Sequence, residues 1–176
     1  MIAAIPTRYR GIKFRSRLEA RWAAFFDASG IRWEYEPQGY TMDGTNYLPD
    51  FWLPLVTSRG HEPGLFFEIK PNAPEVDEQV KAAKLCAGTS KPVIIAASGP
   101  KHPEFELLFE YVNDSRGVWD DSGVIFAKCP DCDTIDIGFY LASDHSCKCG
   151  GFFSTMDLTL CAAREGFNEQ VRWMAA

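Results

Sequence analysis

TNYLPDFWLPLVTSRGHEPGLFFEIK, residues 45 to 70, contains two mostly apolar runs, each with one acidic residue. The first run, TNYLPDFWL, reads as a strand, and Pro49 indicates an edge or an end because proline has no amide to donate to a sheet. The second run, LFFEIK, is a compact strand that ends in Glu68, Ile69 and Lys70. Alternation along a strand places Glu68 and Lys70 on one face and Ile69 on the other. If the strands are neighbours, Asp50 and Glu68 can approach the same cation.

Two carboxylates at this position favour a particular chemistry. With a backbone carbonyl they suit Mg²⁺, or Mn²⁺ in its place, because hard ions prefer oxygen ligands. Such an ion neutralises phosphate charge and lowers the pKa of a bound water. Lys70 can orient that water or stabilise the charged transition state, and Glu19 can complete the ion's shell or bind it through a water. The pattern predicts phosphodiester hydrolysis; the alternative is a hairpin with exposed charges at its ends.

The flanking sequence predicts an α/β fold, a mixed sheet flanked by helices. A helix begins at Ser16, with Glu19 three positions on as in a capping box, and stops at Gly30. Asp43-Gly44 predicts a hairpin turn. Further expected elements are a helix over 74 to 88 with Val76, Val80, Ala83 and Leu85 as its apolar side, a strand over Val93 to Ala97, a helix over 103 to 112, and largely helical structure over 155 to 175. We expect a core over 1 to 112, a linker over 113 to 123 and a small module over 124 to 176.

Four of the six cysteines form two close pairs, Cys129 with Cys132 and Cys147 with Cys149, separated by fourteen residues. Two such pairs of thiolates can form the tetrahedral site that Zn²⁺ favours. His145 can replace one thiolate, and the alternative is four unligated thiols in a small hairpin. We therefore expect a structural zinc site, since nothing in the spacing leaves a ligand position open for catalysis. Cys86 and Cys161 are expected to pack in a core.

The net charge of −6 at first argues against a nucleic-acid partner. Residues 8 to 21, however, hold six Arg or Lys and one Glu. We expect this stripe to bind the phosphate backbone of DNA without reading sequence; the alternative is a solvated helix start. The candidate binding residues are Arg8, Arg10, Lys13, Arg15 and Arg17, of which Arg17 lies two residues from Glu19.

The runs SRLEARWAAFFDASGIRWEYEP (16 to 37), YLPDFWLP (47 to 54) and FFEIKP (66 to 71) together resemble the PD-(D/E)xK nuclease superfamily. They are most similar to its branch of transposase-associated endonuclease subunits and small phage nucleases. The resemblance implies a restriction-endonuclease-like core, Mg²⁺-dependent hydrolysis that leaves 5′-phosphates, and a phage or mobile-element origin. It implies site roles for Glu19, Asp50, Glu68 and Lys70. Gln79 loosely matches a glutamine that some relatives carry on the next helix, and the cysteine segment resembles a zinc ribbon.

Three functions follow as hypotheses. The first is a Mg²⁺-dependent endonuclease acting on DNA. The second is a non-catalytic nucleic-acid-binding or adaptor module, and the third is a subunit of a recombination or packaging complex that cleaves only with a protein partner or as a homodimer. The loop residue His61 is expected to be a bystander. No apolar run is long enough to cross a membrane and no secretory signal is evident, so we expect a cytoplasmic protein without a small-molecule cofactor.

Overall fold

The computed structural model of this chain describes residues 4–58, 62–97, 99–100, 105–112, 115–139, 146–152 and 154–155. Within these ranges, side chains are described for all residues except those in 105–125, 138–139 and 154–155. Within these ranges the chain forms two helices, a nine-stranded sheet and two two-stranded sheets. The sheet is mixed, because β8 with β9 and β7 with β12 are parallel pairs among antiparallel ones. The expected α/β class with a mixed sheet is therefore confirmed.

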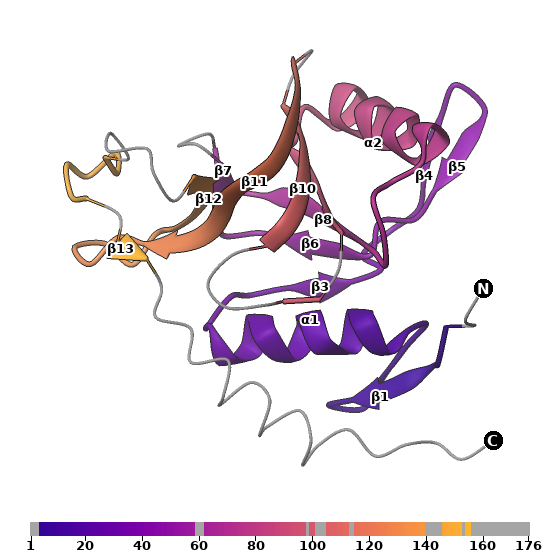
Figure 1. Cartoon of the computed structure of the whole chain (residues 1–176), viewed down its shortest axis with the longest axis horizontal. Helices are drawn as coiled ribbons and strands as arrows, with labels where there is room; N and C mark the ends of the chain where they lie inside the picture. Colours follow the sequence, from indigo (N-terminus) through magenta and orange to yellow (C-terminus); the bar gives the residue numbers. More distant parts are fainter. Residues whose placement is uncertain are drawn as a thin grey trace.

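Figure 1 shows the elements in the order in which they follow one another along the chain. In order they are β1 (Thr7–Tyr9), β2 (Ile12–Phe14), α1 (Arg17–Ala28), β3 (Glu34–Tyr35), β4 (Tyr40–Met42), β5 (Thr45–Tyr47), β6 (Phe51–Leu53), β7 (Val56–Ser58), β8 (Leu65–Lys70), α2 (Val76–Thr89), β9 (Val93–Ala97), β10 (Phe105–Val112), β11 (Ser115–Lys128), β12 (Ile135–Phe139) and β13 (Ser154–Thr155).

The large sheet has the strand order β3-β6-β8-β9-β10-β11-β12-β7, with β13 beside β11. Only Pro54 and Leu55 connect β6 to β7, yet these two strands lie near opposite ends of that order. The sheet must therefore curl back towards itself. Phe126 of β11 accordingly contacts Phe25 and Phe67, and so belongs to the same core as α1.

Helix α1 begins where the sequence predicts, because the Ser16 hydroxyl accepts a hydrogen bond from the Glu19 amide at 3.1 Å. Its apolar side buries Trp22, Phe25 and Phe26 completely or nearly so. These rings pack against Phe67 and other apolar residues of the sheet. The aromatic contacts fix α1 across one face of the sheet and so fix the position of Glu19.

Helix α2 covers the opposite face together with the β4–β5 hairpin (Figure 1). Phe66 belongs to this second core, while its neighbours Leu65 and Phe67 belong to the first, as strand alternation requires. The expected apolar side of α2 is partly wrong. Val76, Val80 and Ala83 are exposed, and Leu85 is buried with Ala82 and Cys86 instead. The buried position of Cys86 confirms its expected packing role.

The second half of the chain contains more strand than the sequence predicts. The helix expected over 103 to 112 is wrong, because 105–112 form β10, which pairs with β9 on one side and β11 on the other. The linker expected over 113 to 123 is also wrong, because β11 runs unbroken from Ser115 to Lys128. Strands β10 and β11 each pair with a strand on both sides, and this pairing outweighs the local sequence preference for a helix or a linker. The helical structure expected over 155 to 175 lies outside the described residues, apart from Thr155 in β13.

Candidate active site

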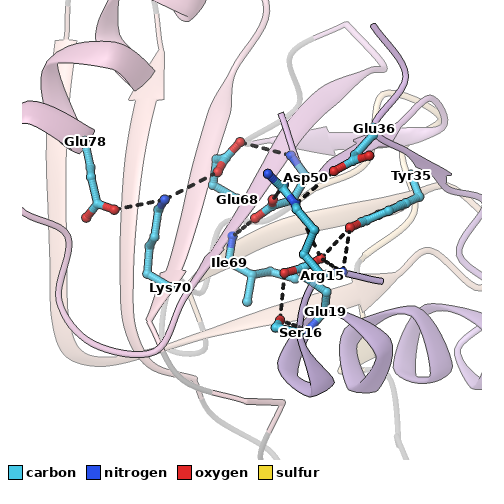
Figure 2. Close-up of polar contacts among 10 residues, drawn as sticks. All are labelled: Arg15, Ser16, Glu19, Tyr35, Glu36, Asp50, Glu68, Ile69, Lys70 and Glu78. Atoms are coloured by element: carbon cyan, nitrogen blue, oxygen red, sulfur yellow. Dashed lines mark hydrogen bonds and ion pairs between the residues drawn. The ribbon is translucent and has the colours of Figure 1, made fainter. Parts of the chain in front are cut away.

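Asp50 and Glu68, which we call the acidic pair, lie side by side at the ends of two hydrogen-bonded strands (Figure 2). Antiparallel pairing of β6 with β8 sets Phe51 opposite Phe67. Asp50, which precedes Phe51, therefore lies next to Glu68, which follows Phe67. The Asp50 amide donates to Glu68 Oε1 at 3.0 Å, and the Ile69 amide donates to Asp50 Oδ2 at 2.8 Å. The expected approach of the two carboxylates is confirmed.

The acidic pair is almost completely shielded from water, with Asp50 5% and Glu68 2% exposed. Burial raises the pKa of Asp50 well above its usual range, and the charge of Glu68 raises it further. The Ile69 amide and Arg15 lower the pKa of Asp50, but they do not outweigh these two effects. Burial also raises the pKa of Glu68, although Lys70 and the Tyr47 hydroxyl both lower it. Two buried like charges are unfavourable, so a neighbouring positive charge stabilises the ionised pair.

Arg15 supplies one positive charge to this site. Its Nη2 lies 2.5 Å from Asp50 Oδ1 and its Nε lies 2.8 Å from Glu36 Oε1, so the guanidinium bridges two carboxylates (Figure 2). Half of the side chain, 53%, still faces solvent. We expected Arg15 to bind phosphate; in this structure its guanidinium is directed at the acidic pair.

Lys70 lies on the same face as Glu68, as strand alternation predicts. Its Nζ is 2.9 Å from Glu78 Oε1 on α2 and 3.9 Å from Glu68 Oε2. Burial lowers the pKa of Lys70, but the contacts with Glu78 and Glu68 outweigh this and raise it overall. Lys70 is therefore a fixed cation at this site. Gln79, the loose match on the same helix, donates to the Pro74 carbonyl at 3.0 Å and does not line the cavity described below.

Glu19 is buried at the start of α1, and among the residues described its hydrogen bonds are local or with β3. Ser16 Oγ donates to its Oε1 at 2.7 Å, and the Tyr35 hydroxyl donates to its Oε2 at 2.5 Å. The Arg15 amide also donates to Oε2 at 3.1 Å. Glu19 thus lies beside the acidic pair, linked to it through Arg15. It does not form a set of three closely spaced carboxylates with that pair among the residues described.

A cavity of about 540 Å³ opens in front of these groups, within the range of pockets that hold small ligands. Its lining residues come from the segment before β1, the start of α1 and the two residues before it, the acidic end of the β6–β8 pair and α2. They are Ala4, Ile5, Arg15, Ser16, Arg17, Leu18, Glu19, Asp50, Ile69, Lys70, Pro71 and Glu78. All catalytic candidates except Glu68 therefore reach one open space, and Glu68 contacts two of them, Asp50 and Lys70.

The other basic candidates lie on a hairpin that precedes α1. β1 pairs with β2 so that Arg8 faces Lys13, and the turn at Arg10 and Gly11 has positive φ angles of 48° and 83°. Arg10 forms an ion pair with Asp27 at 3.1 Å. All three basic side chains are exposed, whereas Arg17 is half-buried at the cavity. The stripe thus divides into a basic hairpin and two cavity residues, Arg15 and Arg17.

Sequence reasoning missed the groups that hold the acidic residues in place. Tyr35, Tyr47, Glu36 and Glu78 each contact a candidate residue. Nothing in the local sequence signals the bond of Tyr35 to a helix residue sixteen positions earlier. His61 and His145 lie outside the described residues, as does Cys161.

The four cysteines, which we call the cysteine cluster, come together as the sequence predicts. Cys129 Sγ is 3.5 Å from Cys149 Sγ, and Cys132 Sγ is 3.5 Å from Cys147 Sγ. All four sulfurs lie within 4.8 Å of one another. Tetrahedral Zn–S bonds of about 2.3 Å would place sulfurs about 3.8 Å apart. The cluster could therefore hold a metal ion such as zinc.

The backbone of the cysteine cluster is shaped closely around the sulfurs. The Gly151 amide points to Cys149 Sγ at 3.4 Å, and a Cβ at Gly151 would lie 2.9 Å from Cys129 Sγ and 2.3 Å from Asp131 Oδ2. The Cys147 amide donates to the Gly151 carbonyl at 2.7 Å, which closes the second loop. Only glycine fits at position 151 without moving the cluster.

Comparisons with protein-family models, curated proteins and solved structures found no match for this chain. Among the residues that the structure describes, neither helix has the length and apolar character needed to span a membrane.

Proposed function

We propose that this protein is a metal-dependent endonuclease of the PD-(D/E)xK type that acts on DNA with Mg²⁺ or Mn²⁺. The observation that supports this most is the acidic pair, buried at the ends of two paired strands beside Lys70 and a cavity. A buried pair of carboxylates is costly for the fold, and active sites are where such costs are commonly retained. The restriction-endonuclease-like core implied by the sequence belongs to the same proposal.

The donor set fits the proposed ion. Asp50 and Glu68 offer oxygen ligands, which Mg²⁺ prefers, and a cation would offset the burial that raises the pKa of both groups and the charge of Glu68 that raises the pKa of Asp50 further. These two residues would hold the ion, with Glu19 as a candidate third group acting directly or through a water. When bound, the ion would neutralise phosphate charge and supply a water of lowered pKa.

The chain's own residues provide the remaining requirements. Lys70 is held protonated by Glu78 and can donate hydrogen bonds to a water or to a phosphate oxygen in the cavity. Arg17 lines the same cavity, and the basic hairpin lies just before it in the chain. These cations can hold the DNA backbone without reading its sequence.

The cysteine cluster fits a structural zinc site in this proposal. All four sulfurs face one another, so a bound ion would have no open position for a substrate. Strand β12, which follows Cys132 in the chain, pairs with β7, and Lys148, between Cys147 and Cys149, lies 3.0 Å from Glu62. The zinc would therefore stabilise this side of the sheet and leave the chemistry to the acidic pair.

A second function is favoured by one specific observation. Both cations near the acidic pair already have carboxylate partners, Arg15 with Asp50 and Lys70 with Glu78. A site neutralised in this way would suit a non-catalytic DNA-binding or adaptor module. It would equally suit a subunit that needs a protein partner, or a second copy of itself, before it cleaves.

The test is a cleavage assay with supercoiled plasmid and a labelled panel of duplex, branched and single-stranded DNA, in Mg²⁺, in Mn²⁺ and in EDTA. Lys70→Ala is compared with Lys84→Ala, which removes the same charge from an ion pair with Asp43 away from the cavity. Metal-dependent cutting that K70A loses and K84A keeps supports the endonuclease. DNA binding without cutting by any of the three proteins supports the adaptor instead.

A further inference from the structure

We propose that Arg15 is an internal counter-ion that a divalent cation displaces from Asp50, and that the displaced guanidinium then binds a phosphate of the substrate. This inference rests on the proposed function, because it concerns the same acidic pair. It assigns Arg15 a role that links ion binding to DNA binding.

The first step concerns which carboxylate oxygens are available. Asp50 Oδ2 is taken by the Ile69 amide and Glu68 Oε1 by the Asp50 amide. The other oxygen of Asp50, Oδ1, is the one that Arg15 Nη2 approaches at 2.5 Å. A cation that binds Asp50 through this oxygen therefore meets the guanidinium there. Like charges repel strongly in a shielded site, so the two compete.

The second step concerns where the guanidinium goes. The Arg15 amide is fixed by Glu19 Oε2 and by the Tyr35 hydroxyl, so the backbone stays in place and only the side chain needs to turn. Its Nε lies 2.8 Å from Glu36 Oε1 (Figure 2), and in this proposal that contact is kept when Nη2 leaves Asp50. Glu36 has a left-handed φ of 46°, uncommon outside glycine, and its amide is bonded to the Asp50 carbonyl at 2.9 Å. Glu36 thus acts as a second anchor that keeps the released group beside the site.

The third step concerns the substrate. Arg15 is 53% exposed and lines the cavity together with Arg17 and Lys70. A phosphate oxygen in this cavity would replace Asp50 as the partner of Nη2, and arginine binds phosphate well through its planar donor set. The ion would release the Arg15 guanidinium that binds DNA, and DNA would draw that guanidinium away from the oxygen that binds the ion. Binding of the ion would therefore strengthen binding of DNA, and the reverse.

The test measures ion binding without cleavage. Zinc-loaded wild type, Arg15→Gln, Arg15→Lys and Asp50→Asn are titrated with Mn²⁺ by calorimetry, after circular dichroism and thermal melting verify that each is folded. The matched control is Arg32→Gln, which makes the same charge change at an exposed position outside the cavity. We expect R15Q to bind Mn²⁺ at least about tenfold more tightly than wild type, R15K to fall between them, R32Q to stay within about twofold, and D50N to lose the site.

A second measurement follows the coupling. A fluorescein-labelled duplex is titrated with each protein in EDTA and in Ca²⁺, a hard cation that can occupy oxygen sites. Wild type should bind the duplex about tenfold more tightly with Ca²⁺, and R15Q should lose most of that gain. If Mn²⁺ binding depends on Asp50 but R15Q binds no more tightly than wild type, the inference is wrong while the endonuclease proposal stands. If no protein shows Mn²⁺ binding that D50N abolishes, both are overturned.

Discussion

At the scale of single residues, Tyr35 is the group that fixes Glu19 at the edge of the cavity. Its hydroxyl donates to Glu19 Oε2 at 2.5 Å, and hydrogen bonds to a charged group contribute about 1.5–3 kcal/mol. We expect Tyr35→Phe to lower the free energy of unfolding by about 2 kcal/mol, measured by urea denaturation. Tyr40→Phe, whose ring packs on Phe66 in the second core, is the control. An equal loss in both variants would argue against a specific role of the Glu19 bond.

Asp50→Asn is expected to stabilise the protein at neutral pH. The pKa of Asp50 is raised in the folded state, so its ionised form opposes folding. This penalty is present at pH 7 and fades as the pH falls through the folded pKa towards the unfolded value near about 4. D50N should therefore exceed wild type by about 1 kcal/mol at pH 7 in EDTA, and the difference should vanish near about pH 4.

Urea denaturation across this pH range measures the effect, with Asp43→Asn as the control because that carboxylate is 83% exposed. Added Mg²⁺ should stabilise wild type and leave D50N unchanged, since an ion that binds only the folded state adds stability by mass action. A D50N protein that is less stable than wild type at pH 7 would mean that the Arg15 ion pair outweighs the burial of Asp50.

The site could be predicted from the sequence only where its residues are fixed by strand geometry. Strand alternation placed Glu68 and Lys70 on one face. Asp50 joined them only if the two strands were neighbours, as β6 and β8 are, although β7 lies between them in the chain. Glu36 and Tyr35 were missed because their contacts depend on how β3 and α1 pack, which no local pattern encodes. Arg15 was identified as a basic residue, but its partner Asp50 is thirty-five positions away.

At the scale of elements, the loop that closes the cysteine cluster depends on glycine. A methyl group at Gly151 would lie 2.9 Å from Cys129 Sγ and 2.3 Å from Asp131 Oδ2. Gly151→Ala should therefore distort the cluster and release bound zinc at least about tenfold faster, followed with a chromogenic chelator. Gly39→Ala, where the nearest atom is 3.9 Å away, should retain the wild-type rate. Equal rates would show that the cluster tolerates a shift of its backbone.

The elements themselves were predictable to different degrees. α1 has a cap at Ser16 and a strong apolar side, so its bounds follow from local signals. The segment FELLFEYV has enough helix-forming residues to suggest a helix, but β9 and β11 flank it and make it a strand. The polar run NDSRGVWDDSG resembles a linker in composition, yet most of it pairs in β11. Long-range pairing decides both cases, and a single sequence does not reveal it.

At the scale of the whole molecule, the cysteine cluster is connected to the α1 core by two strands. β11 carries Phe126 into that core and continues to Cys129, while β12 carries Ile137 and pairs with β7. Val56 of β7 belongs to the same core. The cysteine cluster and the acidic pair thus adjoin strands of one continuous sheet, so a change at the cysteines can reach the core that positions the acidic residues.

We therefore expect removal of zinc to lower the stability of the α1 core as well as that of the cysteine cluster. Structural zinc contributes folding free energy directly, because the unfolded chain holds no preformed site. Hydrogen exchange should show faster exchange of α1 amides after chelation, and calorimetry should show one transition at a lower temperature. Adding Zn²⁺ back is the control for irreversible damage, and Cys132→Ser should reproduce the chelated state. If α1 protection is unchanged while residues 129–152 lose theirs, the two regions unfold independently, and the pairing of β12 with β7 does not carry the metal's stabilisation into the core.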